Sequence, residues 1–184
     1  MKKKIVLLIF SALTVTLLVI TFSFLEQIIL NSKLYTIKNL TCNENFRVTI
    51  NPDNYFEVGG EQLINRYIGE KHNTTIKLKK ILIDSVEKRV NLYISLENKW
   101  KIIQGRNIVL FTVVDNKNSR SVTYDSFEFS ISDSEGFKVP YSQYSLNNDS
   151  IIISIEKDIF FSKNGKLTLD FSLNKCIEYK LAIL

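Results

Sequence analysis

Residues 90–97 of this chain read VNLYISLE, and this stretch decides the fold class. Val90, Leu92, Ile94 and Leu96 alternate with more polar residues, so every second side chain would lie on the same face of a strand. β-Branched, aromatic and aliphatic residues of this kind are typical of strands. The stretch therefore predicts a β-strand with one buried face.

The same alternation recurs on both sides of this stretch, and turn-forming residues separate the repeats. About eight or nine strands at regular spacing, without helices between them, indicate an antiparallel sandwich or barrel. The strands are expected around residues 46–50, 76–83, 90–96, 107–114, 122–131, 151–155, 167–173 and 177–183.

Four local features qualify this pattern. The apolar parity changes near Lys79 and Lys80, which predicts a β-bulge. Residues 107–114 are apolar on both faces, which predicts a central strand. Residues 61–68 have apolar residues at helical spacing and predict a short helix. Asn164 and Gly165 predict a tight hairpin turn.

The N-terminus carries a different signal. Lys2, Lys3 and Lys4 precede residues 5–25, a run without charge. As a helix this run would be about 30 Å long, which matches the hydrocarbon thickness of a bilayer. We expect a transmembrane signal-anchor helix, with residues 1–4 in the cytoplasm because lysines stay on that side.

The rest of the chain is then exported, as a linker over residues 26–41 and an extracytoplasmic domain over residues 42–184. Residues 27–30 are expected to extend the anchor helix. Because the apolar run is longer than in ordinary signal peptides, a retained anchor in the cell membrane is favoured. The alternative is cleavage near Ser23 and a secreted domain.

Charge and composition argue against several functions. The chain has 24 Lys and Arg against 19 Asp and Glu; without the three anchor lysines the exported part carries 21 − 19 = +2, so nucleic acid is not an expected partner. The single histidine, His72, lies in a polar connection and is expected to be a solvated loop residue. No nucleophile motif or phosphate-binding glycine loop occurs. We therefore expect no catalytic residues, metal or cofactor.

Two residue groups stand out in the exported part. Cys42 and Cys176 lie near its two ends and are predicted to form a disulfide, because the outside of the cell is oxidising; two free buried thiols are the alternative. Lys99, Trp100 and Lys101 combine an aromatic ring with two cations and are predicted to contact a partner. The alternative is that Trp100 folds over the edge of the core.

The strand patterns at residues 74–84, 90–94 and 108–115 resemble those of immunoglobulin-like extracytoplasmic domains of uncharacterised bacterial envelope proteins, some attached to anti-sigma factors or lipoproteins. The resemblance implies an immunoglobulin-like, antiparallel β-sandwich outside the cytoplasm and no catalytic residues. The chain departs from these proteins because four cytoplasmic residues cannot bind a sigma factor, and no lipid-attachment cysteine follows the apolar run.

The sequence thus predicts a membrane-anchored β-sandwich module that binds a protein or a cell-envelope polymer. Two alternatives stay open. One is a hydrolase that acts on envelope material through a pair of carboxylates. The other is a secreted structural or antigen-like domain released by cleavage near Ser23.

Overall fold

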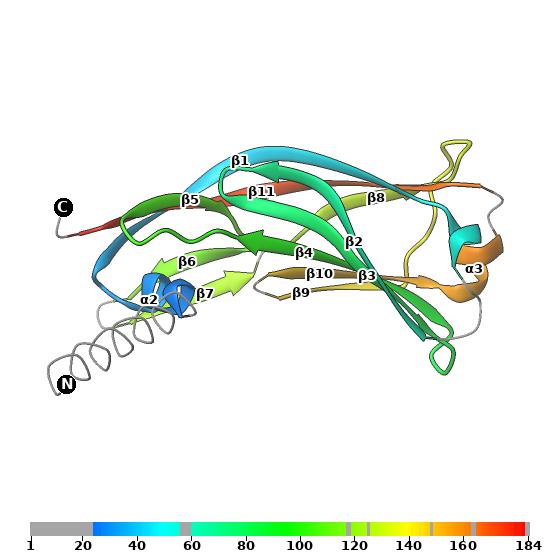
Figure 1. Ribbon diagram of the computed structural model, residues 1–184, viewed down its shortest axis with the longest axis horizontal. Coiled ribbons are helices and arrows are strands. Elements are labelled where there is room, and N and C mark those ends of the chain that lie inside the picture. The colour runs from blue at the N-terminus through cyan, green and yellow to red at the C-terminus, as the bar shows by residue number, and fades with distance from the viewer. Residues whose placement is uncertain are drawn as a thin grey trace, which may run out of the picture.

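The computed structural model describes residues 24–55, 60–116, 119–124, 126–147, 149–162 and 165–182. This part of the chain forms an elongated molecule built mostly of long antiparallel strands (Figure 1). In chain order the elements are α2 (Leu25–Asn31), β1 (Tyr35–Ile50), the 3-10 turn η1 (Pro52–Asn54), β2 (Gly60–Lys71), β3 (Thr74–Asp84), β4 (Arg89–Asn98), β5 (Gln104–Ile108), β6 (Phe111–Asp115), β7 (Arg120–Tyr124), β8 (Glu128–Ser132), β9 (Gln143–Leu146), β10 (Ser150–Glu156), α3 (Lys157–Ser162) and β11 (Leu167–Leu181).

Two antiparallel sheets account for most of the strands. In sheet A, β11 pairs with β1 on one edge, while its other edge pairs first with β8 and then with β5. Sheet B has the order β2-β3-β4-β10-β9. The β6–β7 hairpin forms a third, two-stranded sheet. The prediction of an all-β chain of antiparallel sheets is confirmed.

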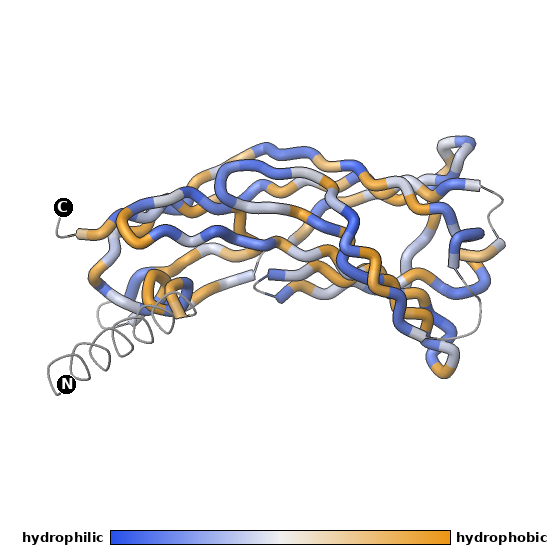
Figure 2. Tube along the Cα trace, viewed as in Figure 1, coloured by the Kyte–Doolittle hydropathy of each residue, from blue (hydrophilic) through white to orange (hydrophobic). Residues whose placement is uncertain are grey.

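The main core lies between sheets A and B. Hydrophobic and hydrophilic residues alternate along the strands (Figure 2), so each strand turns one apolar face toward the opposite sheet. On β3 this face changes parity where the register shifts between Leu78 and Lys80, which confirms the predicted bulge. Fully buried members of this core include Ile76, Leu78, Ile81, Val90, Ile94, Ile108, Ile151, Ile153, Ile155 and Phe160.

A smaller core covers the opposite face of sheet A at one end of the molecule. There α2, the β6–β7 hairpin and the loop after β4 pack over Tyr35, Ile177 and Tyr179. The Asn39 amide joins β1 to β6, because it both donates to and accepts from the backbone of Val113 at 2.8 and 2.9 Å. This end of sheet A is therefore buried on the face away from sheet B.

The predicted disulfide is present. Cys42 on β1 and Cys176 on β11 are bonded, with Cα atoms 5.9 Å apart. They lie beside the register shift between Thr41 and Glu44, where β1 bulges against β11. The bond ties together strands that are far apart in sequence but paired side by side.

The prediction of a helix over residues 61–68 is wrong. These residues belong to β2, which has two register shifts against β3, the first between Leu63 and Arg66 and the second between Tyr67 and Gly69. Ile64 and Ile68 pack against the core, as residues four apart on one face of a strand do, whereas Leu63 and Tyr67 are 69% and 59% exposed. The apolar residues have helical spacing because each of these two core residues follows an exposed apolar residue.

The prediction of one central strand over residues 107–114 is also wrong. β5 ends at Ile108 in sheet A, and β6 begins at Phe111 in the separate hairpin. Ile108 and Leu110 point into the main core, whereas Val109 and Phe111 point into the smaller core. The segment is apolar on both faces because it passes between two cores.

Three boundaries differ from expectation. Residues 26–41 are not a linker, because they contain most of α2 and the first part of β1, whose Tyr35 is buried. Residues 167–173 and 177–183 are not two strands; β11 is continuous from Leu167 to Leu181. The Asn164–Gly165 hairpin is wrong as well, because α3 follows β10 and the next strand, β11, lies in the other sheet; Asn164 itself is outside the described residues.

The predicted membrane anchor, residues 5–25, lies outside the described residues except for Phe24 and Leu25. Lys2, Lys3, Lys4 and Ser23 also lie outside them. Among the described residues, no helix has both the length and the hydropathy required to cross a bilayer.

Candidate binding surface

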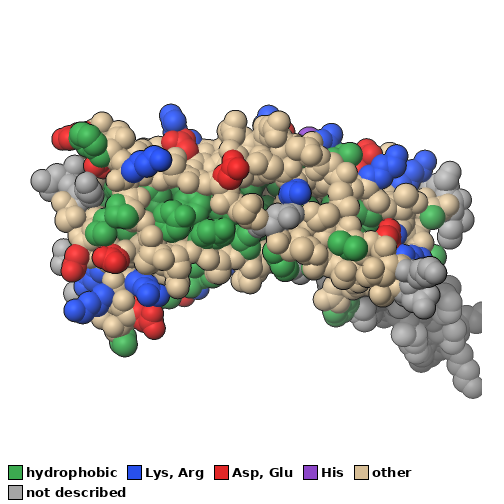
Figure 3. Space-filling model, turned by 180° about the vertical axis from the view of Figure 1, so that it is seen from behind, with side chains coloured by type: hydrophobic (Ala, Val, Ile, Leu, Met, Phe, Trp, Pro, Cys, Tyr) green, Lys and Arg blue, Asp and Glu red, His purple; other side chains and the backbone are tan. Residues whose placement is uncertain are grey.

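A cluster of aromatic side chains lies on the open side of the sandwich, where β8 at the edge of sheet A faces β9 at the edge of sheet B. We call Phe127, Phe129, Tyr141 and Tyr144 the aromatic surface. The ring centroid of Phe129 lies 4.5 Å from that of Tyr141 and 5.6 Å from that of Tyr144. Tyr141 is 45% exposed and Tyr144 is 37% exposed. Hydrophobic side chains gather along the middle of the rear face of the molecule (Figure 3).

The aromatic surface is continuous with the core. Phe127 is buried, and its ring lies 5.9 Å from that of Phe171, which in turn stacks on Phe46 at 5.6 Å. The exposed tyrosines thus stand at the end of a row of packed rings. Side chains held in this way lose little conformational freedom when they meet a partner.

The chemistry of this surface suits binding. Within the described part of the chain, no hydrogen bond involves the hydroxyl of Tyr141 or Tyr144, so both can donate to or accept from a partner. Rings with an apolar body and one polar atom are enriched at protein interfaces. An exposed cluster of apolar side chains on a folded domain also marks interaction sites.

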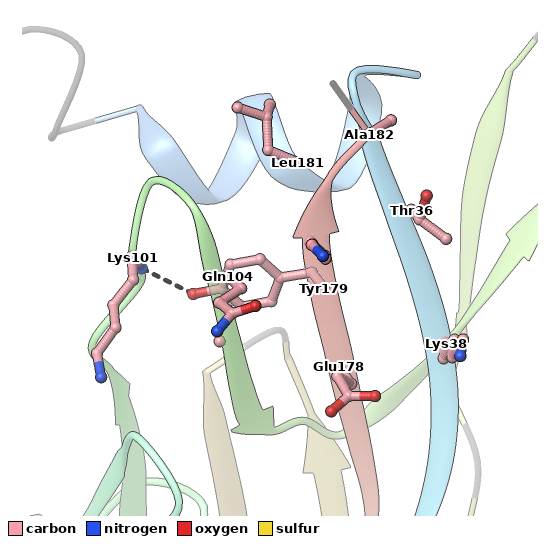
Figure 4. Close-up of a pocket in the computed structure, with 10 residues that line it drawn as sticks. Thr36, Lys38, Lys101, Gln104, Glu178, Tyr179, Leu181 and Ala182 are labelled. Atoms are coloured by element: carbon pink, nitrogen blue, oxygen red, sulfur yellow. Dashed lines mark hydrogen bonds between the residues drawn. The ribbon is translucent and has the colours of Figure 1, made fainter. Parts of the chain in front are cut away.

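A second candidate site is a pocket at the end of the molecule that carries α2 (Figure 4). It has a volume of about 580 Å³, and Lys38, Lys101 and Lys180 supply three cations to its lining against one carboxylate, Glu178. Lys38 on β1 and Glu178 on β11 are directly paired across the two strands. We call this hollow the basic pocket. Its excess of ammonium groups favours an anionic ligand.

Tyr179 forms the floor of the basic pocket. Its hydroxyl accepts a hydrogen bond from the backbone N–H of Lys101 at 2.7 Å, which fixes the β4–β5 loop against β11. Burial raises the pKa of Tyr179. The phenol is therefore neutral at physiological pH, and the lysines and Glu178 set the charge of the pocket.

The predicted contact residues Lys99, Trp100 and Lys101 occupy the loop between β4 and β5. Trp100 is half-buried and packs on Tyr179 with ring centroids 5.3 Å apart, so it covers the edge of the smaller core. Lys99 forms an ion pair with Glu70 at 3.0 Å. Lys101 lines the basic pocket. That these residues contact a partner stays a prediction.

Glu26 on α2 lies in the same region as Trp100. Burial raises the pKa of Glu26, the negative charge of Asp149 raises it further, and the nearby Trp100 indole opposes both effects. The carboxylate is thus partly desolvated, and no cation among the described residues forms an ion pair with it.

Residues that could support catalysis are scattered. His72 lies in the turn between β2 and β3, where its Nε2 is 3.5 Å from a carboxylate oxygen of Glu44. Within the described residues, no group of three or more His, Cys, Asp and Glu side chains could hold a metal ion.

Two carboxylates share one shallow depression on the outer face of sheet A. Glu128 on β8 and Asp170 on β11 line it together with Ser130 and Ser172. Both oxygens of Asp170 accept from the guanidinium of Arg47, at 2.6 and 3.2 Å. This ion pair occupies the carboxylate that a hydrolytic pair would require.

No protein-family model, no curated protein and no solved structure matches this chain.

Sequence reasoning missed the aromatic surface. Its members come from β8, from β9 and from the segments before these strands, and nothing in the sequence shows that the edges of two sheets meet. One signal was present: residues 127–144 contain five aromatic residues, Phe127, Phe129, Phe137, Tyr141 and Tyr144. Such a density near turns is more than one buried strand face requires.

Proposed function

We propose that this chain is a membrane-anchored extracytoplasmic β-sandwich module that binds a protein or a cell-envelope polymer and catalyses no reaction. The observation that carries the proposal is the aromatic surface. Its two tyrosines are exposed, their hydroxyls have no partner in the described part of the chain, and buried rings support them from below.

The location is part of the proposal. Residues 5–25 serve as a single membrane span, Lys2, Lys3 and Lys4 stay in the cytoplasm, and the domain lies outside. The disulfide supports export, because such bonds persist in oxidising compartments and are rare in the cytosol. Cleavage near Ser23 would give a secreted form of the same domain, and N-terminal sequencing of the mature protein separates the two forms.

We also propose an immunoglobulin-like relationship at the level of two packed antiparallel sheets. The strand order differs from that of the immunoglobulin fold. β1 and β11, the first and last strands described, pair in one sheet, whereas the constant-type immunoglobulin sandwich places its first and last strands in opposite sheets. The relationship thus concerns architecture rather than connectivity.

Site-specific photo-crosslinking in intact cells tests the binding function. A benzoylphenylalanine replaces Tyr144 in the full chain, and the control carries it at Phe137, which is 64% exposed and makes no ring contact with the aromatic surface. We expect a discrete adduct at position 144 that is absent at position 137. Protease sensitivity of the adduct identifies a protein, and sensitivity to glycan hydrolysis identifies a polymer. Equal labelling at both positions, or none, would contradict the proposal.

The second candidate is the envelope-directed hydrolase, and the depression that holds Glu128 and Asp170 is the observation in its favour. It requires a water-activating carboxylate, yet Asp170 is engaged by Arg47. Release of labelled fragments from purified cell walls by the full chain, abolished in Glu128→Gln and retained in Tyr144→Ser, would favour the hydrolase over the binding module.

A further inference from the structure

One end of the molecule carries a group of exposed apolar side chains. Phe24, Leu34, Ile102 and Ile103 are 51%, 52%, 42% and 53% exposed, and we call them the end patch. Phe24 immediately precedes α2, Leu34 lies between α2 and β1, and the isoleucines lie in the β4–β5 loop.

Backbone hydrogen bonds bring these segments together. The N–H of Leu181 donates to the carbonyl of Ile103 at 2.8 Å, and the N–H of Ala182 donates to the carbonyl of Leu34 at 2.7 Å. The Tyr35 hydroxyl donates to the carbonyl of Ile102 at 2.7 Å. α2 crosses beside the end of β11 (Figure 4), where Leu25 and Ile29 pack with Tyr179 and Leu181. The segments that carry the end patch therefore meet at one end of the molecule.

Lysines border the end patch. Lys38, Lys101 and Lys180 line the basic pocket, which opens beside the β4–β5 loop. Lys101 directly precedes the two exposed isoleucines in the sequence. Apolar side chains with lysines beside them are typical of surfaces that lie in the membrane interface, where the apolar groups enter the acyl boundary and the ammonium groups meet lipid phosphates.

The proposed membrane span joins the domain at this end. The predicted span ends at Leu25, and Leu25 is already buried in the smaller core at 3% exposure. No free linker separates span and domain, so a spanning helix would hold the end patch within a few residues of the lipid. The membrane is thus the surface that the patch meets first.

We propose that the end patch rests on the outer surface of the bilayer that residues 5–25 span, with Lys38, Lys101 and Lys180 against lipid phosphates. This inference rests on the proposed anchor. It gives the domain a fixed orientation: the β3–β4 turn, at the opposite end of the molecule from α2, points away from the membrane (Figure 1).

The single tryptophan of the chain makes a direct test available. The full chain is reconstituted in vesicles whose phospholipids carry bromine on the upper part of the acyl chain, which quenches nearby indole fluorescence. In the variant Trp100→Phe/Ile103→Trp the only indole lies in the end patch. The matched control, Trp100→Phe/Val86→Trp, places it in the β3–β4 turn, at a residue that is 94% exposed.

We expect quenching at position 103 to exceed quenching at position 86 at least about threefold, since an interfacial side chain lies at the acyl boundary. In chains that keep the native Trp100, the double substitution Ile102→Ser/Ile103→Ser should lower the quenching of Trp100. The substitution Val86→Ser should not. Flotation with the vesicles reports the anchor separately. A chain that floats with lipid while positions 103 and 86 are quenched equally overturns the inference and leaves the anchor intact. A chain that does not float overturns both.

Discussion

The guanidinium of Arg120 on β7 donates a 2.7 Å hydrogen bond to the backbone carbonyl of Ser32, just past the end of α2. It also donates to the carbonyls of Tyr35 at 2.5 Å and Ile29 at 3.4 Å. Asp115 holds the guanidinium from the other side at 2.7 Å. α2 has only seven residues and would not be stable alone. Arg120 therefore fixes the helix that connects the predicted anchor to the sandwich.

Replacement of Arg120 by Ala should lower the free energy of unfolding by about 3 kcal/mol, because its side chain is 5% exposed and three carbonyls lose a charged donor. The control is Arg47→Ala, which removes an ion pair whose arginine is 71% exposed and should therefore cost much less stability. Urea unfolding followed by Trp100 fluorescence measures both values. Equal losses would show that Arg120 does not hold α2.

The ion pairs around Asp115 predict a loss of stability in acid. Hydrogen bonds from Arg120 and then Lys33 hold the pKa of Asp115 below its usual value of 3.8. A carboxyl group with a lowered pKa in the folded state contributes stability above its unfolded pKa and loses it as the pH falls through the folded value. We expect wild type to lose more stability than Asp115→Asn between about pH 5 and about pH 3, a range that brackets the ordinary pKa of an aspartate. Parallel pH profiles would contradict this.

Glu26 predicts the opposite slope. Burial and the charge of Asp149 raise its pKa above the ordinary 4.5, so the folded state favours the protonated form. Stability from this group is present below the unfolded pKa and is lost as the pH rises through the folded value. Glu26→Gln should therefore raise the free energy of unfolding at neutral pH, by less than about 1 kcal/mol because the group is partly solvated. It should have no effect at pH 3.5, about a unit below the reference value. Thermal unfolding at the two pH values measures the difference. A variant that is less stable than wild type at pH 7 would show that the favourable interaction of the carboxylate with the Trp100 indole outweighs the cost of burial.

Much of the fold could be predicted from the alternation of residues, because an apolar face every second position is what a strand over a core requires. The strands around Val90–Leu96 and Ile151–Ile155 and the bulge at Lys79–Lys80 are all in the structure. The predictions fail where the same spacing of apolar residues can arise from two different structures. Exposed apolar residues beside the core residues of β2 give helical spacing, and the passage between two cores after Ile108 gives the appearance of a central strand.

The candidate surfaces were less predictable, since each depends on which strands end beside one another. Lys38, Lys101 and Lys180 are far apart in sequence and meet because β1 pairs with β11 and the β4–β5 loop folds over Tyr179. The disulfide was an exception. Cys42 and Cys176 could be paired without knowledge of the topology, because they are the only two cysteines.

The disulfide predicts a large change in stability. Cys42 and Cys176 are 134 residues apart, so the bond restricts the unfolded chain strongly, and the chain-entropy model gives a stabilisation of roughly 4–5 kcal/mol. The double variant Cys42→Ala/Cys176→Ala should lose about this amount in urea unfolding and should show a larger m-value, because its unfolded state is more expanded. Addition of a reductant to wild type should lower its stability to that of the double variant. A loss below about 1 kcal/mol would show that the paired strands β1 and β11 already restrict the unfolded ensemble.

Gly105 provides a test of the packing that positions the β4–β5 loop. A Cβ atom at this position would lie 2.6 Å from Cζ and 2.9 Å from Cε1 of Tyr179, so Gly105→Ala must displace the phenol that accepts from Lys101. We expect a cost of about 2 kcal/mol from overpacking. In a Tyr179→Leu background, which removes the obstructing ring, the same substitution should cost much less, and this difference is the coupling energy of a double-mutant cycle.

Gly136→Ala is the matched control: its φ of +86° makes the substitution strained without any contact within 4 Å, so its cost should be equal in both backgrounds. If Gly105→Ala also costs the same in both, Tyr179 does not determine the position of the loop.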